Sequence, residues 1–183
     1  MKSTNKFKRI LTMIVTMVIT FSLLAFSAFS SNAAVYSSPY PYLKVQGHIQ
    51  NRSWLSAKTV EMGTAVTVGL KGKTSKLDRI RIGIPNRPVG GGGIKINVHY
   101  AGADWTGFRK ADCTNTAEVA PTGRTRAIDA VQIELYGDLK KYYTIEYKVH
   151  SSKSGWSTLS KNGRTAGTPG TTGGIDLLHI RIH

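Results

Sequence analysis

Tryptophan and histidine recur in this chain at a fixed step, and both residue types can contact a ligand directly. The tryptophans are Trp54, Trp105 and Trp156, at intervals of 51 residues, and the histidines are His48, His99 and His150, each six residues before its tryptophan. Exposed indole rings stack on sugar rings and are frequent at binding hot spots, whereas imidazoles bind metal ions or form hydrogen bonds. The spacing predicts three tandem copies with up to three equivalent binding sites, rather than one asymmetric catalytic centre.

A carboxylate also recurs, at the start of a later apolar segment in each copy: Asp78, Asp129 and Asp176. Such an aspartate could accept backbone N–H groups of the glycine turn before it, or orient a sugar hydroxyl. Glycoside hydrolysis needs a second carboxylate across the bond, and no copy has a second acid in register with its partners. Nucleophile-elbow, HExxH and P-loop motifs are absent as well, so the sequence predicts a protein that is not an enzyme.

Each candidate residue type has a structural alternative. Three equivalent tryptophans could fill three core or half-buried positions, and this packing interpretation is favoured over stacking on a ligand. The histidines could meet at a metal ion, but a hydrogen bond from each histidine to its own loop is favoured. The sequence therefore predicts no metal and no cofactor, and it leaves open whether the tryptophans are exposed.

Alternating apolar and polar residues predict the elements that position these side chains. The pattern is present in residues 80–84, 94–99, 143–150 and 178–182, and it is typical of half-buried strands. Glycine and asparagine turns separate the strands, and Gly90 to Gly93 are expected to form a flexible hinge between copies. The predicted fold is all-β, a pseudo-threefold β-prism-like domain of three repeats (about 43–92, 93–142 and 143–183), with a β-trefoil as the alternative.

Small residues mark a turn before each aspartate. They are Gly69, Ala120 and Gly167, followed three residues later by Gly72, Gly123 and Gly170. Copy three reads Tyr147-Lys148-Val149-His150, Gly155-Trp156, Asn162-Gly163 and Ala166-Gly167-Thr168-Pro169-Gly170. In these motifs the chain resembles the ChW family, the clostridial hydrophobic repeat with a characteristic tryptophan, although Ser53 and Asp104 replace the glycine before tryptophan in the other copies. The resemblance implies an exported, non-enzymatic protein that attaches to surfaces or binds extracellular polymers.

The N-terminus has the features of a secretory signal. Four cations precede an apolar run at residues 10–26, and Ser31-Asn32-Ala33 provides small residues for cleavage. We expect a signal peptide at 1–33 and one domain at 34–183, with a retained membrane anchor as the alternative and no membrane span after cleavage. The expected location is outside the cell, either in the medium or held non-covalently on the cell wall. Cys113 lies in a polar loop, where a thiol without a role is favoured over an intermolecular disulfide.

The charge of the exported chain suggests the kind of partner. Without the four cations of the signal, 21 Lys and Arg face 10 acids, a net charge of +11. Such a field attracts anionic polymers, although plain solubility is an equal alternative, and no nucleic-acid motif accompanies the scattered cations. The predicted function is a lectin-like or adhesive binding module for cell-envelope or extracellular polysaccharide. The alternative is a structural or assembly protein of the cell surface.

Overall fold

The computed structural model describes residues 40–72, 74–86, 91–113, 115–119 and 126–183. The chain divides into two units, Met1–Tyr36 and Ser37–His183, and every described residue belongs to the second. The expected signal peptide at 1–33 lies outside the described residues. Within the described ranges, no helix is long and apolar enough to cross a membrane.

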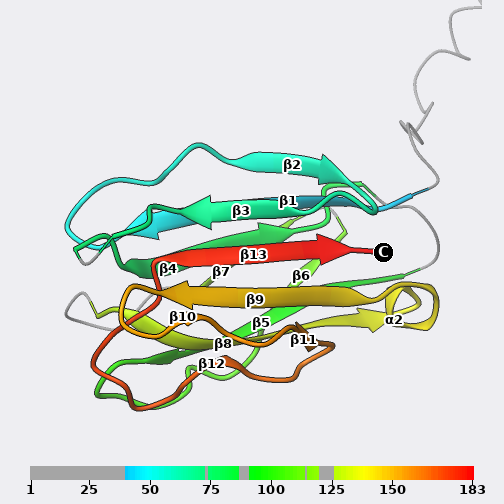
Figure 1. Ribbon diagram of the computed structural model, residues 1–183. Helices are drawn as coiled ribbons and strands as arrows, with labels where there is room; N and C mark the ends of the chain where they lie inside the picture. Colours follow the sequence, from blue (N-terminus) through cyan, green and yellow to red (C-terminus); the bar gives the residue numbers. More distant parts are fainter. Residues whose placement is uncertain (1–39, 73, 87–90, 114, 120–125) are drawn as a thin grey trace, which may run out of the picture. The chain divides into compact units, whose positions relative to one another are not determined.

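Short strands make up nearly all the regular structure of the described residues, which confirms the predicted all-β class (Figure 1). Copy one contains β1 (Tyr42–Ile49), β2 (Lys58–Glu61), β3 (Val66–Gly69) and β4 (Leu77–Gly83). Copy two contains β5 (Gly92–Tyr100), β6 (Arg109–Asp112), β7 (Thr116–Val119), β8 (Ile128–Gly137) and the single helical turn α2 (Leu139–Tyr142). Copy three contains β9 (Ile145–Ser151), β10 (Gly155–Trp156), β11 (Ser160–Lys161), β12 (Ala166–Gly167) and β13 (Leu177–Ile182).

The strands pair antiparallel in three sheets over the described residues. Sheet 1 has the order β2-β1-β4-β7, sheet 2 has β12-β8-β5-β6, and sheet 3 has β10-β9-β13-β3 with β11 also on β9. Each sheet takes one strand from another copy: β7 of copy two joins sheet 1, β12 of copy three joins sheet 2, and β3 of copy one joins sheet 3. Figure 1 shows the last exchange, with β13 lying between β9 and β3. No copy completes its own sheet, so the three depend on one another.

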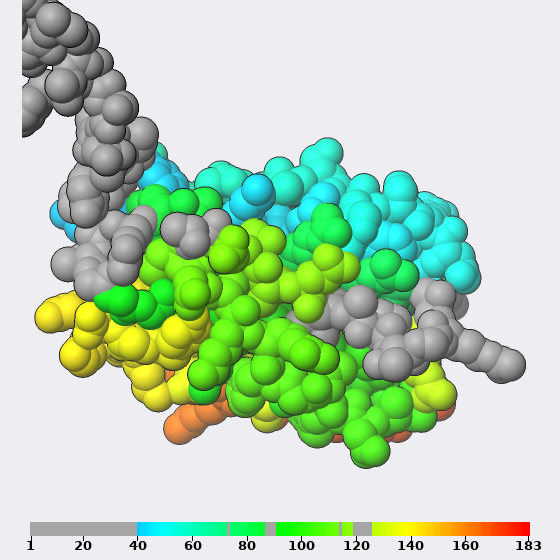
Figure 2. Space-filling view, turned by 180° about the vertical axis from the view of Figure 1, so that it is seen from behind, coloured from blue at the N-terminus to red at the C-terminus, as the bar shows by residue number. Residues whose placement is uncertain are grey.

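Copy two lies across the middle of the face opposite to that in Figure 1. In the space-filling view, its green segment lies between the cyan segment of copy one and the yellow residues that lead into copy three (Figure 2). Three sheets with cyclic strand exchange are compatible with a prism. The sheets establish an all-β, antiparallel fold. The threefold prism and its trefoil alternative stay predictions.

Alternation along the strands produces the core. In β1 the odd-numbered residues are buried and the even-numbered residues are partly exposed, as the period of two predicts. Branched aliphatic side chains of β1, β4, β5, β8, β9 and β13 form one buried cluster. Tyr147 is the largest fully buried side chain; its hydroxyl accepts the N–H of Ile133 at 2.9 Å and donates to the carbonyl of Arg164 at 2.5 Å. The core thus joins copies two and three through a satisfied polar tip.

The small residues of the predicted turns are required where strands are exchanged. Gly69 ends β3 with φ +118°, and Gly167 ends β12 with φ +96°. A Cβ on Gly69 would lie 2.0 Å from the carbonyl oxygen of Asp176, and one on Gly167 would lie 2.3 Å from that of Asp129. The exchanged strand therefore touches the backbone of the neighbouring copy beside its aspartate. Ala120, at the same place in copy two, lies outside the described residues.

One local prediction is wrong. Gly92 and Gly93 are not part of a flexible hinge but begin β5, where a Cβ on Gly92 would lie 2.2 Å from the carbonyl oxygen of Tyr136. Gly90 lies outside the described residues. Cys113 lies in a turn directly after β6, as the sequence indicates, but its side chain belongs to the core cluster and its thiol donates to the carbonyl of Gly92 at 3.0 Å. Pairing of β6 with β5 turns this residue inward, although polar residues surround it in the sequence.

Candidate functional site

Each tryptophan lies edge-on against the histidine of its own copy. The ring centroids are 5.2, 5.4 and 5.2 Å apart for His48–Trp54, His99–Trp105 and His150–Trp156, with interplanar angles of 70°, 71° and 69°. Backbone pairing fixes this geometry, because the same residues face each other as antiparallel partners in all three copies. The six-residue spacing therefore matches a short turn that folds the chain back, so that the tryptophan pairs with its histidine.

Each histidine is in turn held by the aspartate of its copy. The Nδ1–Oδ1 distances are 2.5 Å for His48–Asp78, 2.6 Å for His99–Asp129 and 2.6 Å for His150–Asp176. All three carboxylates are fully buried. The predicted hydrogen bond from each histidine to its own loop is wrong. The histidine strand pairs with the strand that begins at or directly beside the aspartate, and this pairing brings the carboxylate to the histidine. We call these three histidine–aspartate pairs the inner pairs.

The second carboxylate oxygen accepts a backbone N–H from the next copy. Gly170 donates to Oδ2 of Asp129 at 2.9 Å, and Gly72 donates to Oδ2 of Asp176 at 3.1 Å. The predicted acceptor role of these two aspartates is confirmed, but each donor is not the glycine preceding that aspartate in its own copy. Oδ2 of Asp78 has no partner among the described residues, and Gly123, the glycine at the corresponding sequence position, lies outside them. Strand exchange between copies explains the change of partner.

The tryptophan rings do not belong to the core. Trp54 and Trp105 are half-buried, and Trp156 is 44% exposed. Half-buried packing is thus correct for two of the three residues, while a fully buried core position is wrong for all of them. Aliphatic side chains fill the interior, which leaves the indoles on the outer side of the sheets. Among the described residues, no group of three or more His, Cys, Asp or Glu side chains is arranged to hold a metal ion.

A row of three polar side chains crosses each sheet beside its tryptophan. The outer rows are Gln46, Arg81 and Glu118 on sheet 1; Asn97, Gln132 and Thr165 on sheet 2; and Lys148, His179 and Thr67 on sheet 3. In each row the first two residues belong to one copy and the third comes from another copy. The three positions are equivalent, but the chemistry differs from row to row.

The row on sheet 1 is charged. Arg81 donates from Nε to Glu118 at 2.8 Å and from Nη1 to Gln46 at 3.5 Å. The guanidinium carbon lies 4.0 Å from the centroid of the Trp54 ring, a cation–π contact that covers one face of the indole. A ligand at this row would meet an arginine already oriented by three neighbours.

The row on sheet 2 is neutral. Asn97 donates to the side-chain oxygen of Gln132 at 3.0 Å, and Gln132 donates to the hydroxyl of Thr165 at 3.0 Å. Thr106, directly after Trp105, donates to the side-chain oxygen of Asn97 at 3.3 Å. These amides and hydroxyls form a continuous hydrogen-bonded line that can both donate to and accept from a ligand hydroxyl.

The row on sheet 3 combines a cation with an imidazole. The ring of His179 lies 6.0 Å from that of Trp156, and its Nδ1 is 2.8 Å from the hydroxyl of Thr67. Lys148 places its ammonium 4.9 Å from the Trp156 centroid. Burial, together with the positive charges of Lys148 and Arg181, lowers the pKa of His179 below its usual value. The imidazole is therefore neutral at pH 7 and can accept a hydrogen bond as well as donate one.

The outer rows escaped the sequence analysis because their residue types do not repeat. Their positions do repeat: two residues before each histidine, three after each aspartate and two before each small turn residue. A comparison of the copies by position rather than by residue identity would have found them.

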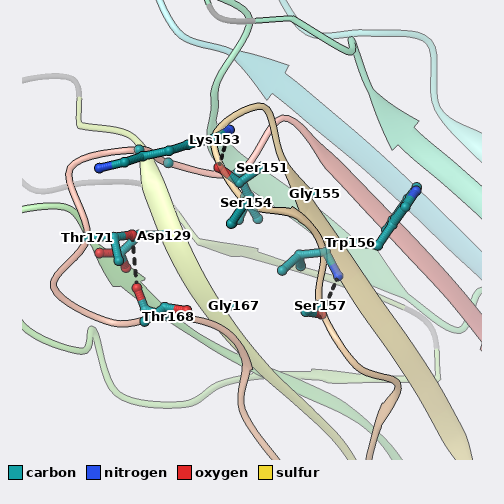
Figure 3. Close-up of a pocket in the computed structure, with 14 residues that line it drawn as sticks. Asp129, Ser151, Lys153, Ser154, Gly155, Trp156, Ser157, Gly167, Thr168 and Thr171 are labelled. Atoms are coloured by element: carbon teal, nitrogen blue, oxygen red, sulfur yellow. Dashed lines mark hydrogen bonds between the residues drawn. The ribbon is translucent and has the colours of Figure 1, made fainter.

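A hollow of about 380 Å³ lies beside the tryptophan loop of copy three, and Trp156 and Lys153 are among the residues that line it. Hydroxyl groups of Ser151, Ser154, Thr168 and Thr171 line it. Figure 3 shows these hydroxyl residues on one side, with the Trp156 ring set apart from them. The hollow and the exposed indole are thus adjacent surfaces, and one extended ligand could contact both.

Comparison of the chain with protein-family models, curated proteins and solved structures found no match. The resemblance to the ChW repeat therefore stays a prediction from the sequence motifs.

Proposed function

We propose that this protein is a secreted, non-enzymatic binding module that attaches to polysaccharide of the cell envelope or of the extracellular space. The observation that carries the proposal is the exposed Trp156 ring beside Lys148 and His179. An apolar aromatic face next to fixed hydrogen-bonding groups matches a sugar ring, which has an apolar face and a rim of hydroxyls. The two other copies repeat this combination with half-buried indoles.

The inner pairs support this role because they hold the indole in place. A ring fixed edge-on against a hydrogen-bonded histidine loses little conformational freedom when a ligand stacks on it. The histidine and the aspartate are both engaged within the fold, so they position the tryptophan and need not touch the ligand themselves.

Three platforms on three sheets suit a repetitive polymer. Weak sites on one rigid body gain avidity when one chain, or a mesh of chains, engages more than one of them. The net charge of +11 would add attraction to acidic polymers, since opposite charges raise the local concentration of the partner. Charged, neutral and imidazole-containing rows would let the sites prefer different sugars or different substituents.

The test is retention of the exported protein on peptidoglycan, teichoic acid, cellulose, xylan and pectin at low and high salt. Trp→Ala variants at positions 54, 105 and 156 should lower retention stepwise from single to double to triple variant, with Trp156 contributing most. Phe108→Ala is the matched control, because Phe108 is an aromatic residue of similar exposure, 40%, outside the three rows. Retention that survives the triple variant would contradict the proposal, and self-association without polymer would favour the structural role.

The row on sheet 1 provides a second arm of the same test. Arg81→Gln copies the corresponding residue of sheet 2, Gln132, and removes the cation beside Trp54. Retention on acidic polymers should fall and become less sensitive to salt, whereas retention on neutral polymers should stay the same. An equal loss on both polymer types would show that Arg81 supports the fold of the platform rather than ligand choice.

A further inference from the structure

The three copies meet at the residues that directly precede the inner aspartates. The N–H of Leu77 donates to the carbonyl of Ile175 at 2.9 Å, and the N–H of Ile175 donates to the carbonyl of Ile128 at 2.6 Å. These equivalent residues, one from each copy, are at most 1% exposed. Two sides of a backbone triangle thus join the copies at one point of the fold.

One residue earlier, the three copies carry Lys76, Ala127 and Gly174. A Cβ placed on Gly174 would lie 2.7 Å from the Cβ of Ala127 and 3.3 Å from Cδ of Lys76, so the three positions are in contact. Alanine and glycine leave the space that the lysine stem fills. Lys76 is only 9% exposed. Its ammonium donates to the hydroxyl of Ser152 at 2.6 Å.

A lysine this buried needs compensation for its charge. Lysines are almost never buried unless paired, because removing an ammonium from water is costly. In the part of the chain that the structure describes, no carboxylate forms an ion pair with Lys76. A hydroxyl alone offsets only part of the lost hydration.

Two further cations face the same place. A hollow of about 650 Å³ is lined by Lys76 of copy one, Arg126 of copy two and Lys153 of copy three, together with Gln50, Ser152 and Thr172. Arg126 is anchored by donating to the carbonyl of Gly102. No acidic side chain is among the described residues that line this hollow. Three positive charges and two hydroxyls therefore surround one cavity without a negative partner.

We propose that this hollow is a binding site for a phosphate group. A phosphate presents several acceptor oxygens, which match one guanidinium, two ammonium groups and neighbouring hydroxyls. The bound anion would supply the counter-charge that Lys76 lacks. The site contains no outer-row residue, although it shares Lys153 with the hollow beside Trp156. It does not rest on the proposed binding of polysaccharide at the tryptophans.

The test is calorimetric titration of the exported protein with inorganic phosphate and with poly(glycerol phosphate), at constant ionic strength. Arg126→Gln and Lys153→Gln change exposed side chains and keep the fold, and each should weaken binding about tenfold, the effect of losing one charge-assisted hydrogen bond. Lys76→Met keeps the buried stem and should have at least the same effect. Lys110→Gln removes an equal charge from β6, away from the hollow, and should leave the affinity unchanged.

The titrations distinguish free phosphate from a phosphodiester polymer as the ligand. They also distinguish the phosphate site from the proposed tryptophan platforms. Tighter binding of the polymer, per phosphate, would identify a phosphodiester chain as the ligand, and equal binding would identify free phosphate. The triple Trp→Ala variant should still bind phosphate, so failure of the tryptophan platforms is distinguishable from failure of this site. Absence of saturable binding, or equal losses in Arg126→Gln and Lys110→Gln, would overturn the proposal.

Discussion

The inner pairs and the outer rows lie on the same strands but differ in how much the copies vary. All three inner pairs have a His–Asp distance of 2.5 or 2.6 Å and a His–Trp centroid distance between 5.2 and 5.4 Å. The outer rows contain an ion pair, a line of amides, and a lysine–histidine–threonine set. The three copies thus share one internal geometry and present three different surfaces.

Burial explains this difference. A buried carboxylate must have hydrogen-bond partners, and Asp129 and Asp176 each also receive a backbone donor from another copy. Changing one partner breaks the link between copies. Apart from Asn97, which is buried, the outer-row residues are partly or fully exposed and can exchange protein hydrogen bonds for water, so most substitutions there should cost little stability. The inner pairs therefore link the copies inside the fold, whereas the outer rows are the surface to which the proposed function assigns recognition.

The largest effect expected from this comparison is that of Asp129→Ala. This change leaves Nδ1 of His99 and the N–H of Gly170 without their acceptor inside the protein. Breaking a buried pair costs about 3–5 kcal/mol, a large part of the stability of an ordinary domain. Urea unfolding should show the loss, and the exposed ion pair provides the control: Glu118→Ala should cost less than about 1 kcal/mol. Similar losses in both variants would remove the distinction between inner and outer residues.

Trp54 and Trp156 contact both the inner pairs and the outer rows. The loss of stability in Trp156→Ala shows whether this indole contributes mainly to the fold or mainly to ligand binding. A fully buried indole would cost about 3–5 kcal/mol to remove, but a ring that is 44% exposed should cost about 1–2 kcal/mol. The variant should remain folded in thermal melts and lose polymer retention. Unfolding by this single change would instead place Trp156 with the inner pairs.

The spacing of Trp and His, 51 residues between copies, was sufficient to predict three tandem copies, because both residue types are rare in this chain. The aspartates follow at intervals of 51 and 47 residues, so the last copy is four residues shorter at this point. The period of two in residues 94–99 and 143–150 predicted strands that the structure contains in β5 and β9. The all-β class followed from such local patterns, which need no knowledge of partners.

What the sequence could not provide were partners from other copies. Gly72 precedes Asp78 by six residues yet donates to Asp176, because strand exchange depends on the whole sheet order. For the same reason the sequence did not predict the third residue of each outer row, which comes from another copy. It also did not predict that Lys76, Arg126 and Lys153 line one hollow. The exposure of Trp156 was also missed, because repetition in the sequence does not distinguish a core position from a surface one.

Glu146 lies on β9, two residues before Lys148, and forms a charged cluster with cations around it. Its substitution measures how much this cluster contributes to stability. Lys161 hydrogen-bonds to it and, with Arg181 and His183, holds its pKa at about 2, below the usual value. The folded-state pKa is depressed, so the stabilisation is present above pH 4.5 and is lost as the pH falls towards 2. Glu146→Gln should cost about 1–2 kcal/mol at pH 7, because its cations are half-exposed, and should flatten the urea midpoint between pH 4.5 and 2. An unchanged acid profile would show that the cluster contributes nothing.

The smallest effect is expected at His179, the outer-row residue whose ring lies edge-on to Trp156 at 6.0 Å. Burial and the charges of Lys148 and Arg181 lower its folded-state pKa, so the unfolded chain binds the proton more readily. Stability should therefore be complete above the unfolded pKa of about 6.5 and decline slightly as the pH falls below it. His179→Gln keeps a hydrogen-bonding side chain for Thr67 and cannot titrate, so the difference in urea midpoint between wild type and variant should change between pH 7.5 and 5. Protonation of the folded protein also places a second cation beside Lys148 at the Trp156 ring, so retention on acidic polymer should rise as the pH falls through the folded-state pKa of His179 in the wild type and not in the variant. A rise of equal size in both proteins would assign the pH response to the overall charge and remove His179 from the recognition surface.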